Sequence, residues 1–211
     1  MEPYLRPWCA AESEFTEKRS RFICHIWPVT SEAEARALIA EMRSKYHDAR
    51  HNCWCYSLRD GSLRYSDDGE PQGTAGQPML NVFVRSAVTD VCCVVTRYFG
   101  GILLGAGGLT RAYAQAAKDA LTAAQIAKMC LWELWSLSCP YPLYERVVKL
   151  TERSGGMVRN VSYGQEVSLL LAFPDTAFST FSHSLTELTA GALSCTREGE
   201  EYLPTGPIPV N

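Results

Sequence analysis

The sequence predicts an α+β protein of two domains, residues 1–130 and 131–211. Three observations support this fold class. The chain has 211 residues and is 46% hydrophobic, which is enough to bury a core and lies between the usual sizes of one domain and two. Strand-like and helix-like segments alternate along it without an internal repeat. From about residue 131 their order is β-α-β-β-α-β, the split pattern of a ferredoxin-like domain.

Local sequence patterns predict the first strands and the first helix of the first domain. Residues 14–29 alternate polar and apolar side chains, which predicts strand structure. Ser31 followed by Glu34 is a capping box, and the apolar residues after it recur at helical spacing, which predicts an amphipathic helix. Residues 51–58 predict a second strand, and a turn signal before residues 64–66 predicts the returning arm of a hairpin.

The rest of the first domain contains two glycine-rich stretches. Residues 67–78, DDGEPQGTAGQP, hold three glycines, two prolines and three carboxylates and therefore predict a loop. A short helix over about 78–86 follows it. Residues 90–96, DVCCVVT, form a nearly continuous apolar run, which favours a central strand buried on both faces. The second glycine-rich stretch then opens a helix from about Gly108 to Ala127.

The second domain follows the same rules. Both of its expected helices end at glycine, which is typical of a helix C-terminus, and the tail PTGPIPVN predicts irregular structure. The expected strands are 131–139, 157–163, 166–173 and 192–204, and the expected helices are 141–156 and 175–191.

Composition excludes several classes of protein. Residues 1–130 carry 15 Lys and Arg against 14 Asp and Glu, and residues 131–211 carry 5 against 9. The chain therefore lacks the basic footprint of a strong sequence-independent nucleic-acid binder. No apolar run approaches the roughly 20 residues of a membrane helix, and the N-terminus lacks the apolar region of a signal peptide. We expect a cytoplasmic protein without membrane association.

The nine cysteines do not form a disulfide or metal framework. Their number is odd, and the close pairs Cys53/Cys55 and Cys92/Cys93 lie in strand-like runs, so we expect small buried hydrophobic residues. The segment around His47, His51, Cys53 and Cys55 has ligand types that zinc accepts, but strand geometry disfavours a shared site. We expect no bound metal and no cofactor.

The segment VVTRYFGGILLGAGGLTRAYAQAA has two interpretations. Glycines between a strand and a helix let an anion approach the free N–H groups of the helix N-terminus, with arginines adding charge. They also permit a tight turn in which strand and helix pack closely, and the residues alone leave both interpretations open. Neither common nucleotide-binding motif fits the spacing. The residues concerned are Arg97, Gly100, Gly101, Gly105, Gly107, Gly108 and Arg111.

The carboxylates of the acidic loop, Asp67, Asp68 and Glu70, also allow two interpretations. They could bind a hard cation or transfer protons. The favoured interpretation is a turn in which Asp side chains accept hydrogen bonds from backbone N–H groups or pair with Arg97.

Four stretches carry a resemblance to a known family. RYSDDGEPQGTAGQPML, VVTRYFGGILLGAGGLTRAYAQA, YHDARHNCWCYSL and RSRFICHIWPV resemble the signature of the YigZ/IMPACT family over about residues 15–125, and the C-terminal part resembles the ferredoxin-like domain of its bacterial two-domain members. Cys55, where an alanine is common, departs from the pattern. The resemblance implies a first domain like one shared by a small-subunit ribosomal protein, elongation factor G and the GHMP kinases. It also implies a role in translation, because eukaryotic members damp the amino-acid starvation response through a protein partner.

The resemblance leads to a functional expectation. We expect a translation-associated regulatory protein, without catalysis, that binds RNA, the ribosome or a protein partner through the face formed by the DDGEP and RYFGG loops. The alternative is an enzyme that holds a phosphate ligand on the glycine-rich loop, and a third possibility is a module that only binds proteins. Ligand-binding residues are expected at Asp67, Asp68, Glu70, Thr74, Arg97, Tyr98, Gly100, Gly101, Gly105, Gly107, Gly108 and Arg111.

Overall fold

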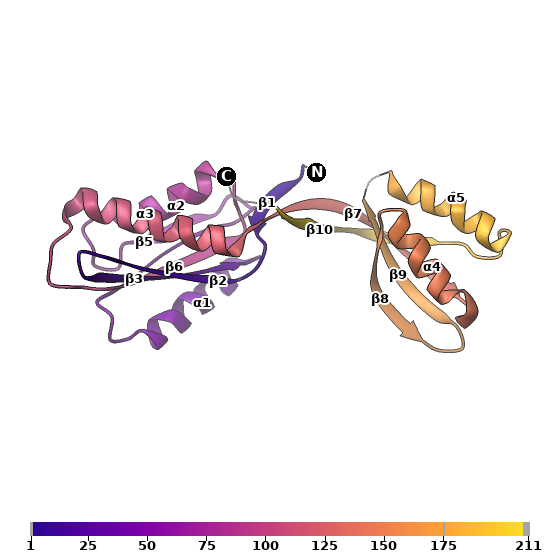
Figure 1. Ribbon diagram of the computed structural model, residues 1–211, viewed down its shortest axis with the longest axis horizontal. Helices are drawn as coiled ribbons and strands as arrows, with labels where there is room; N and C mark the ends of the chain where they lie inside the picture. Colours follow the sequence, from indigo (N-terminus) through magenta and orange to yellow (C-terminus); the bar gives the residue numbers. More distant parts are fainter. Residues whose placement is uncertain (1, 175, 209–211) are drawn as a thin grey trace. The chain divides into compact units, whose positions relative to one another are not determined.

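The computed structural model describes residues 2–174 and 176–208. The chain folds into two compact units, one made mostly of Tyr4–Lys128 and one mostly of Met129–Leu203. Both units combine helices with antiparallel strands (Figure 1), which confirms the predicted α+β class with two domains. Among the described residues, no helix is long and apolar enough to cross a membrane.

The first unit is built on a five-stranded antiparallel sheet in the order β2-β3-β6-β4-β5. β6 occupies the centre and is buried along nearly its whole length. A short strand, β1 (Tyr4–Pro7), precedes the sheet. The sheet strands are β2 (Ala11–Glu17), β3 (Ser20–Pro28), β4 (His51–Ser57), β5 (Leu63–Ser66) and β6 (Val91–Tyr98).

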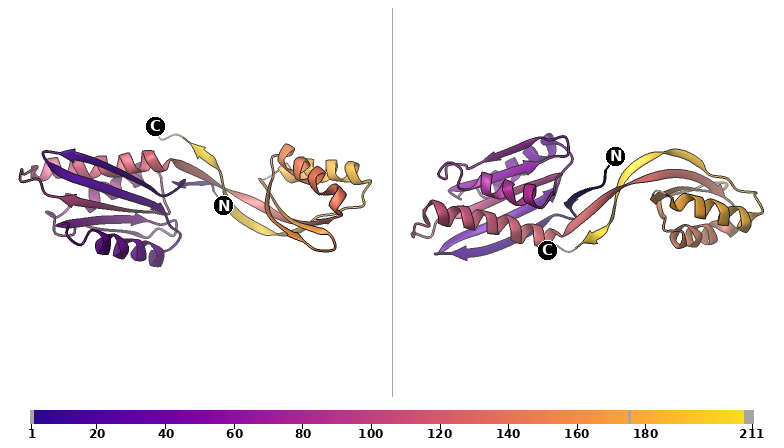
Figure 2. Two further views of the ribbon diagram at one scale, coloured as in Figure 1. Left: turned by 60° about the horizontal axis from the view of Figure 1, so that its bottom comes forward. Right: turned by 90° about the horizontal axis from the view of Figure 1, so that it is seen from above.

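Helices cover both faces of this sheet (Figure 2). α1 (Glu32–Lys45) packs on one face, where Val94 belongs to its core cluster. α2 (Gly76–Arg85) and α3 (Gly105–Ala124) pack on the other, around Val95. Successive residues of β6 therefore enter two different cores, which confirms the prediction of a central strand buried on both faces.

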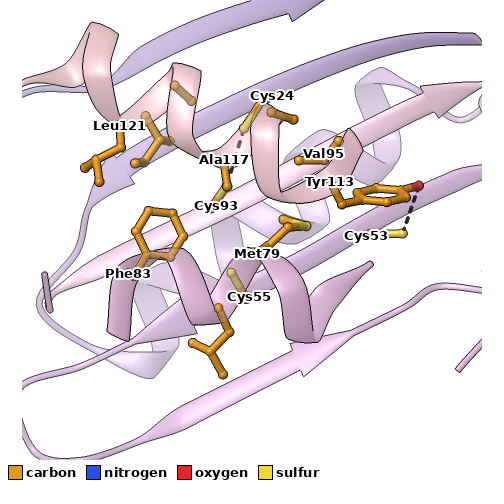
Figure 3. Packing of buried hydrophobic residues seen from close by; sticks show 14 of the residues in the cluster. Cys24, Cys53, Cys55, Met79, Phe83, Cys93, Val95, Tyr113, Ala117 and Leu121 are labelled. Atoms are coloured by element: carbon orange, nitrogen blue, oxygen red, sulfur yellow. Dashed lines mark hydrogen bonds between the residues drawn. The ribbon is translucent and has the colours of Figure 1, made fainter. Parts of the chain in front are cut away.

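The cysteines of the sheet are part of these cores. Figure 3 shows Cys24, Cys55 and Cys93 beneath α2 and α3, surrounded by apolar side chains. All three are fully buried and free, and the sulfurs of Cys24 and Cys93 lie 3.4 Å apart. Cys53 and Cys92 are buried as well, so the predicted role of both close pairs as small core residues is confirmed.

The second sheet is five-stranded in the order β1-β7-β9-β8, with β10 also pairing with β7, and two helices accompany it. The elements of the second unit follow one another as β-α-β-β-α-β, as the sequence predicts. A core of Leu137, Leu171, Phe173 and Phe181 joins the sheet to the helices. The elements are β7 (Ile126–Cys139), α4 (Tyr141–Arg153), β8 (Met157–Tyr163), β9 (Val167–Pro174), α5 (Ala177–Thr189) and β10 (Thr196–Ile208).

Several boundaries differ from the sequence predictions, and β7, for example, begins at Ile126 rather than at residue 131. Residues 14–29 are two strands, because Lys18 and Arg19 take left-handed φ values of 45° and 63° and reverse the chain. Neither residue is one that normally marks such a turn, so the sequence carries no signal for it. α3 begins at Gly105, one turn before the predicted start. The tail predicted to be irregular continues β10 as far as Ile208.

Candidate functional site

Asp67 closes the N-terminus of α2. Its Oδ1 accepts hydrogen bonds from the backbone N–H groups of Ala75 and Gly76 at 3.0 and 2.9 Å, and its Oδ2 accepts one from Gly73 at 2.8 Å. These donors are the ones that a helix N-terminus leaves unpaired, and a carboxylate there is also favoured by the helix dipole. Asp67 therefore stabilises the loop by accepting backbone hydrogen bonds, as the favoured interpretation of the acidic loop requires.

Asp68 ties the acidic loop to the sheet and to α1. Its Oδ2 accepts from the backbone N–H of Asn52 at 2.7 Å, and its Oδ1 pairs with Arg43 at 2.8 Å. The Asp68 carbonyl accepts a hydrogen bond from Nδ1 of His51 at 2.8 Å. Because a carbonyl oxygen only accepts, Nδ1 of His51 carries a proton and its Nε2 is left to face other groups.

Glu70 and Arg97 form a buried ion pair between the acidic loop and the end of β6. Nη1 of Arg97 lies 2.6 Å from Oε1 of Glu70, with both side chains no more than 6% exposed. The hydroxyl of Tyr113 donates to the same oxygen at 2.8 Å, and Nη2 of Arg97 donates to Oγ of Ser20 at 3.2 Å. Hydrogen bonds of this kind offset the cost of burying two charges. Arg97 thus links the two loops, as the sequence suggested.

Tyr113 and Cys53 extend this network into the core without becoming reactive. Burial raises the pKa of the Tyr113 hydroxyl, and the neighbouring Cys53 and Glu70 raise it further, so Tyr113 stays a hydrogen-bond donor. Burial likewise raises the pKa of the Cys53 thiol. Its sulfur lies 3.4 Å from the Tyr113 hydroxyl, the contact drawn as a dashed line in Figure 3. A buried thiol of raised pKa is a poor nucleophile.

The glycines after β6 serve the backbone at identifiable positions. A Cβ on Gly100 would lie 2.0 Å from the carbonyl carbon of Arg19, so only glycine lets the loop pack against the turn between β2 and β3. Gly101 and Gly105 have φ values of 82° and 70° with open space around them, which is a conformational requirement. Gly107 and Gly108 lie inside the first turn of α3. The interpretation as a tight structural turn therefore accounts for three of the five glycines.

The N-terminus of α3 differs from that of α2 because, within residues 2–174 and 176–208, no side chain plays the part that Asp67 plays at α2. Gly105 and Ala106, in its first turn, line a hollow of about 320 Å³ in the first unit. Its other walls are Arg50, His51, Gly69, Glu70, Pro71, Arg97, Phe99, Leu103, Leu104 and Leu109. The acidic loop and the glycine-rich loop therefore lie on the two sides of one hollow.

Of the twelve expected ligand-binding residues, only Glu70, Arg97 and Gly105 line this hollow. The Tyr98 hydroxyl donates to Asp48 at 2.8 Å. Thr74 is buried, and its hydroxyl donates to the carbonyl of Pro71 at 2.6 Å within the acidic loop. Arg111 lines a different hollow of about 280 Å³, on the side of the turn between β2 and β3. Arg111 and Arg97 thus do not form one charged cluster.

Sequence reasoning missed several residues around the hollow. Ser20 and Tyr113 complete the ion-pair network, and His51 appeared only as a weak zinc ligand. Tyr113 brings a hydroxyl group to a buried stripe of α3 that otherwise consists of alanines and leucines, and this was the available signal. Among the described residues, no group of three or more His, Cys, Asp or Glu side chains is arranged to hold a metal ion.

Comparison with known proteins places these features in a family. The Impact N-terminal domain matches residues 18–121, and a domain of unknown function, DUF1949, matches residues 137–192. The IMPACT family member YvyE of Bacillus subtilis is 37% identical over 193 residues, which cover 90% of this chain and 88% of that protein. The chain belongs to the IMPACT family. It carries both domains, as does the YigZ-like group that the sequence resembles.

One further relative and one solved structure match this IMPACT family member over nearly the whole of both chains, and a second structure matches over about half. YigZ of Escherichia coli is 35% identical over 197 residues, covering 92% of this chain and 97% of YigZ. The crystal structure of a hypothetical protein matches with a TM-score of 0.60 and 33% identity, covering 92% of this chain and 97% of that one. The two-domain translational regulator Yih1 matches at 28% identity with a TM-score of 0.35, over 54% of this chain and 47% of its own.

Proposed function

We propose that this IMPACT family member is a translation-associated regulatory protein that binds its partner through the face formed by the DDGEP and RYFGG loops. Family membership supports the link to translation. The observation that carries the choice of face is apolar exposure on the loop between β6 and α3. Phe99, Ile102 and Leu103 are 42%, 41% and 82% exposed. Apolar side chains gathered on one exposed loop favour a contact with another macromolecule.

The charges of this face favour a protein surface over a bare nucleic acid. Arg97, which the sequence suggested would add positive charge next to the glycine-rich loop, is buried and neutralised by Glu70. Arg21, nearby on β3, pairs with Glu14 at 2.7 Å. Binding to nucleic acid rests on unpaired Lys and Arg against phosphates, whereas a protein partner is recognised mainly by buried apolar anchors with a polar rim. Leu103 and Phe99 are the anchors in this proposal.

Binding without catalysis also agrees with the state of the polar groups. Oε1 of Glu70 is already engaged by Arg97 and Tyr113, and the Cys53 thiol has a raised pKa. Asp67 and Asp68 accept hydrogen bonds from backbone N–H groups. The groups that an enzyme would need as base or nucleophile thus serve the fold.

Sedimentation of the tagged full-length protein through a density gradient tests this proposal. Cell lysate is separated at low and high salt for the wild type, for Leu103→Ser and for Val84→Ser. Val84 is 53% exposed on α2, outside the proposed face, so its variant is a matched loss of exposed apolar surface. We expect wild type and Val84→Ser to travel with ribosomal particles or another translation complex and Leu103→Ser to remain at the top. Because an apolar contact is little screened, the association should survive high salt.

A photocrosslinking residue at position 103 or 84 identifies the partner directly. The proposal requires crosslinks from position 103 to a protein of the translation apparatus and far fewer from position 84. Crosslinks mainly to RNA would replace the protein partner with a nucleic-acid one. Equal crosslinking from both positions, or sedimentation of every variant at the top of the gradient, would contradict the proposed face.

A further inference from the structure

The hollow between the acidic and glycine-rich loops has the chemistry of a small-molecule site. We infer that it binds a small organic anion, with a phosphate or carboxylate head at the N-terminus of α3 and an apolar arm against the leucines of the glycine-rich loop. This ligand is a different molecule from the macromolecular partner proposed above, although Phe99 and Leu103 contribute to both surfaces. Four features of the hollow support the inference: free backbone donors, an imidazole nitrogen without a hydrogen bond, an apolar wall and an exposed arginine.

The first feature is the set of backbone donors at the start of α3. Leu104 precedes the helix and supplies no side-chain cap, so the N–H groups of the first turn lack a capping side chain. Gly105 and Ala106 carry two of these groups and line the hollow. A helix N-terminus also presents the positive end of the helix dipole, which favours an anion.

The second feature is independent of the helix. His51 lines the same hollow with a side chain only 10% exposed, and its Nε2 lies 3.9 Å from Oε1 of Glu70, too far for a hydrogen bond. Buried polar atoms without partners are rare in native proteins and require an explanation. A bound head group supplies one.

The third feature defines the rest of the ligand. Phe99, Leu103, Leu104 and Leu109 form an apolar wall opposite the polar floor. The volume of about 320 Å³ lies at the lower end of the ~300–1,000 Å³ found for small-molecule sites. An inorganic ion would leave this wall uncovered, whereas an anion with a short aromatic or aliphatic arm covers it.

The fourth feature is the balance of charge. Glu70 and Arg97 neutralise each other in the floor of the hollow. Arg50 is exposed at the rim and adds a positive charge. The hollow therefore presents donors and a net positive field to a head group, with Arg50 free to close over it.

Nuclear magnetic resonance titration of the full-length protein tests the inference. The probes are phenyl phosphate, phenylacetate, inorganic phosphate and benzyl alcohol, which vary the head and the arm separately. We expect saturable shifts of the Gly105 and Ala106 amides and of the His51 ring with phenyl phosphate or phenylacetate. The tighter of these two identifies the head group. Benzyl alcohol and inorganic phosphate should each bind at least tenfold more weakly, because each lacks one half of the ligand.

Two charge variants provide the control. Arg50→Gln should weaken the better anion about two- to fivefold, the range of an exposed ion pair. Lys118→Gln removes the same charge from an exposed position farther along α3 and should leave the affinity unchanged. Equal binding of benzyl alcohol, equal binding of inorganic phosphate, or non-saturable shifts spread over the surface would overturn the inference. These measurements need no macromolecular partner, so their outcome is separate from that of the proposed function.

Discussion

Helices α2 and α3 both begin after a glycine-rich loop, and the fold completes only one of the two N-termini. At α2, the carboxylate of Asp67 accepts three backbone N–H groups. At α3, no side chain in the described part of the chain performs this role, and the first turn opens onto a hollow. The acidic loop before α2 therefore stabilises the fold, whereas the glycine-rich loop before α3 remains available for binding.

The comparison also shows how the two loops depend on each other. The ion pair of Glu70 and Arg97 holds the acidic loop against the end of β6, directly before the glycine-rich loop. Ser20 accepts hydrogen bonds from both Arg97 and the backbone N–H of Gly100. The acidic loop thus fixes the base of the glycine-rich loop. Four sets of substitutions test this division of roles in order of decreasing effect on stability.

Glu70→Ala should have the largest effect. It leaves the Arg97 charge buried without its partner, and breaking a buried pair in this way costs about 3–5 kcal/mol. The free energy of unfolding, measured by urea denaturation, gives the result. Arg97→Met and the double variant complete a double-mutant cycle. If the double variant is not more stable than the sum of the single losses predicts, the two side chains are not coupled and the proposed link between the loops fails.

Asp67→Ala should have the next largest effect. The variant loses one carboxylate that accepts three N–H groups at the start of α2, and we expect the free energy of unfolding to fall by about 2–3 kcal/mol. Asp60→Ala is the control, because Asp60 accepts a single N–H, from Ser62, in an exposed turn. Its loss should be about 0.5–1 kcal/mol. Similar losses of stability in both variants would show that the three hydrogen bonds of Asp67 contribute no more than the single one of Asp60.

Much of this arrangement was predictable from the sequence. The apolar run of residues 90–96 places β6 in the centre of the sheet, because only a strand covered on both faces needs such a run. Half of the capping box at Ser31 forms, with the N–H of Glu34 donating to the Ser31 hydroxyl at 3.2 Å. The Glu34 carboxylate reaches back one residue further than predicted and accepts from the N–H of Thr30 at 2.8 Å. The pairing of the acidic loop with Arg97 followed from charge alone.

The separate roles of the three carboxylates were not predictable. Three carboxylates lie within four residues of one loop, yet each has a different role. Asp67 caps α2, Asp68 joins the loop to β4 and α1, and Glu70 enters the core. These roles depend on which element each side chain meets in the folded chain, and local rules contain no such information. The turn at Lys18 and Arg19 was missed for the same reason, since the packing of Gly100 against Arg19 comes from distant sequence.

Gly105→Ala and Gly107→Ala should change stability in opposite directions. Gly105 has a φ of 70° with open space around it, so an alanine meets only backbone strain, about 1–2 kcal/mol. Gly107 lies in the helix with only Arg111 near its virtual Cβ, so alanine should stabilise by about 0.4–1 kcal/mol. Thermal unfolding measures both. A loss of similar size at both positions would mean that the first turn of α3 is packed more tightly than the structure indicates.

Leu103→Ser should have the smallest effect on stability and the largest on binding. Leu103 is 82% exposed and its loss removes little buried surface, so the free energy of unfolding should change by less than about 0.5 kcal/mol. A purified partner identified by crosslinking allows the affinity to be measured, and loss of an apolar anchor should weaken it by about 2 kcal/mol or roughly 30-fold. Val84→Ser should change neither quantity. Weakened binding without destabilisation would show that the glycine-rich loop takes part in partner recognition. Unchanged affinity would show that Leu103 has no part in recognition and would leave ligand binding in the hollow as the remaining proposal for this face.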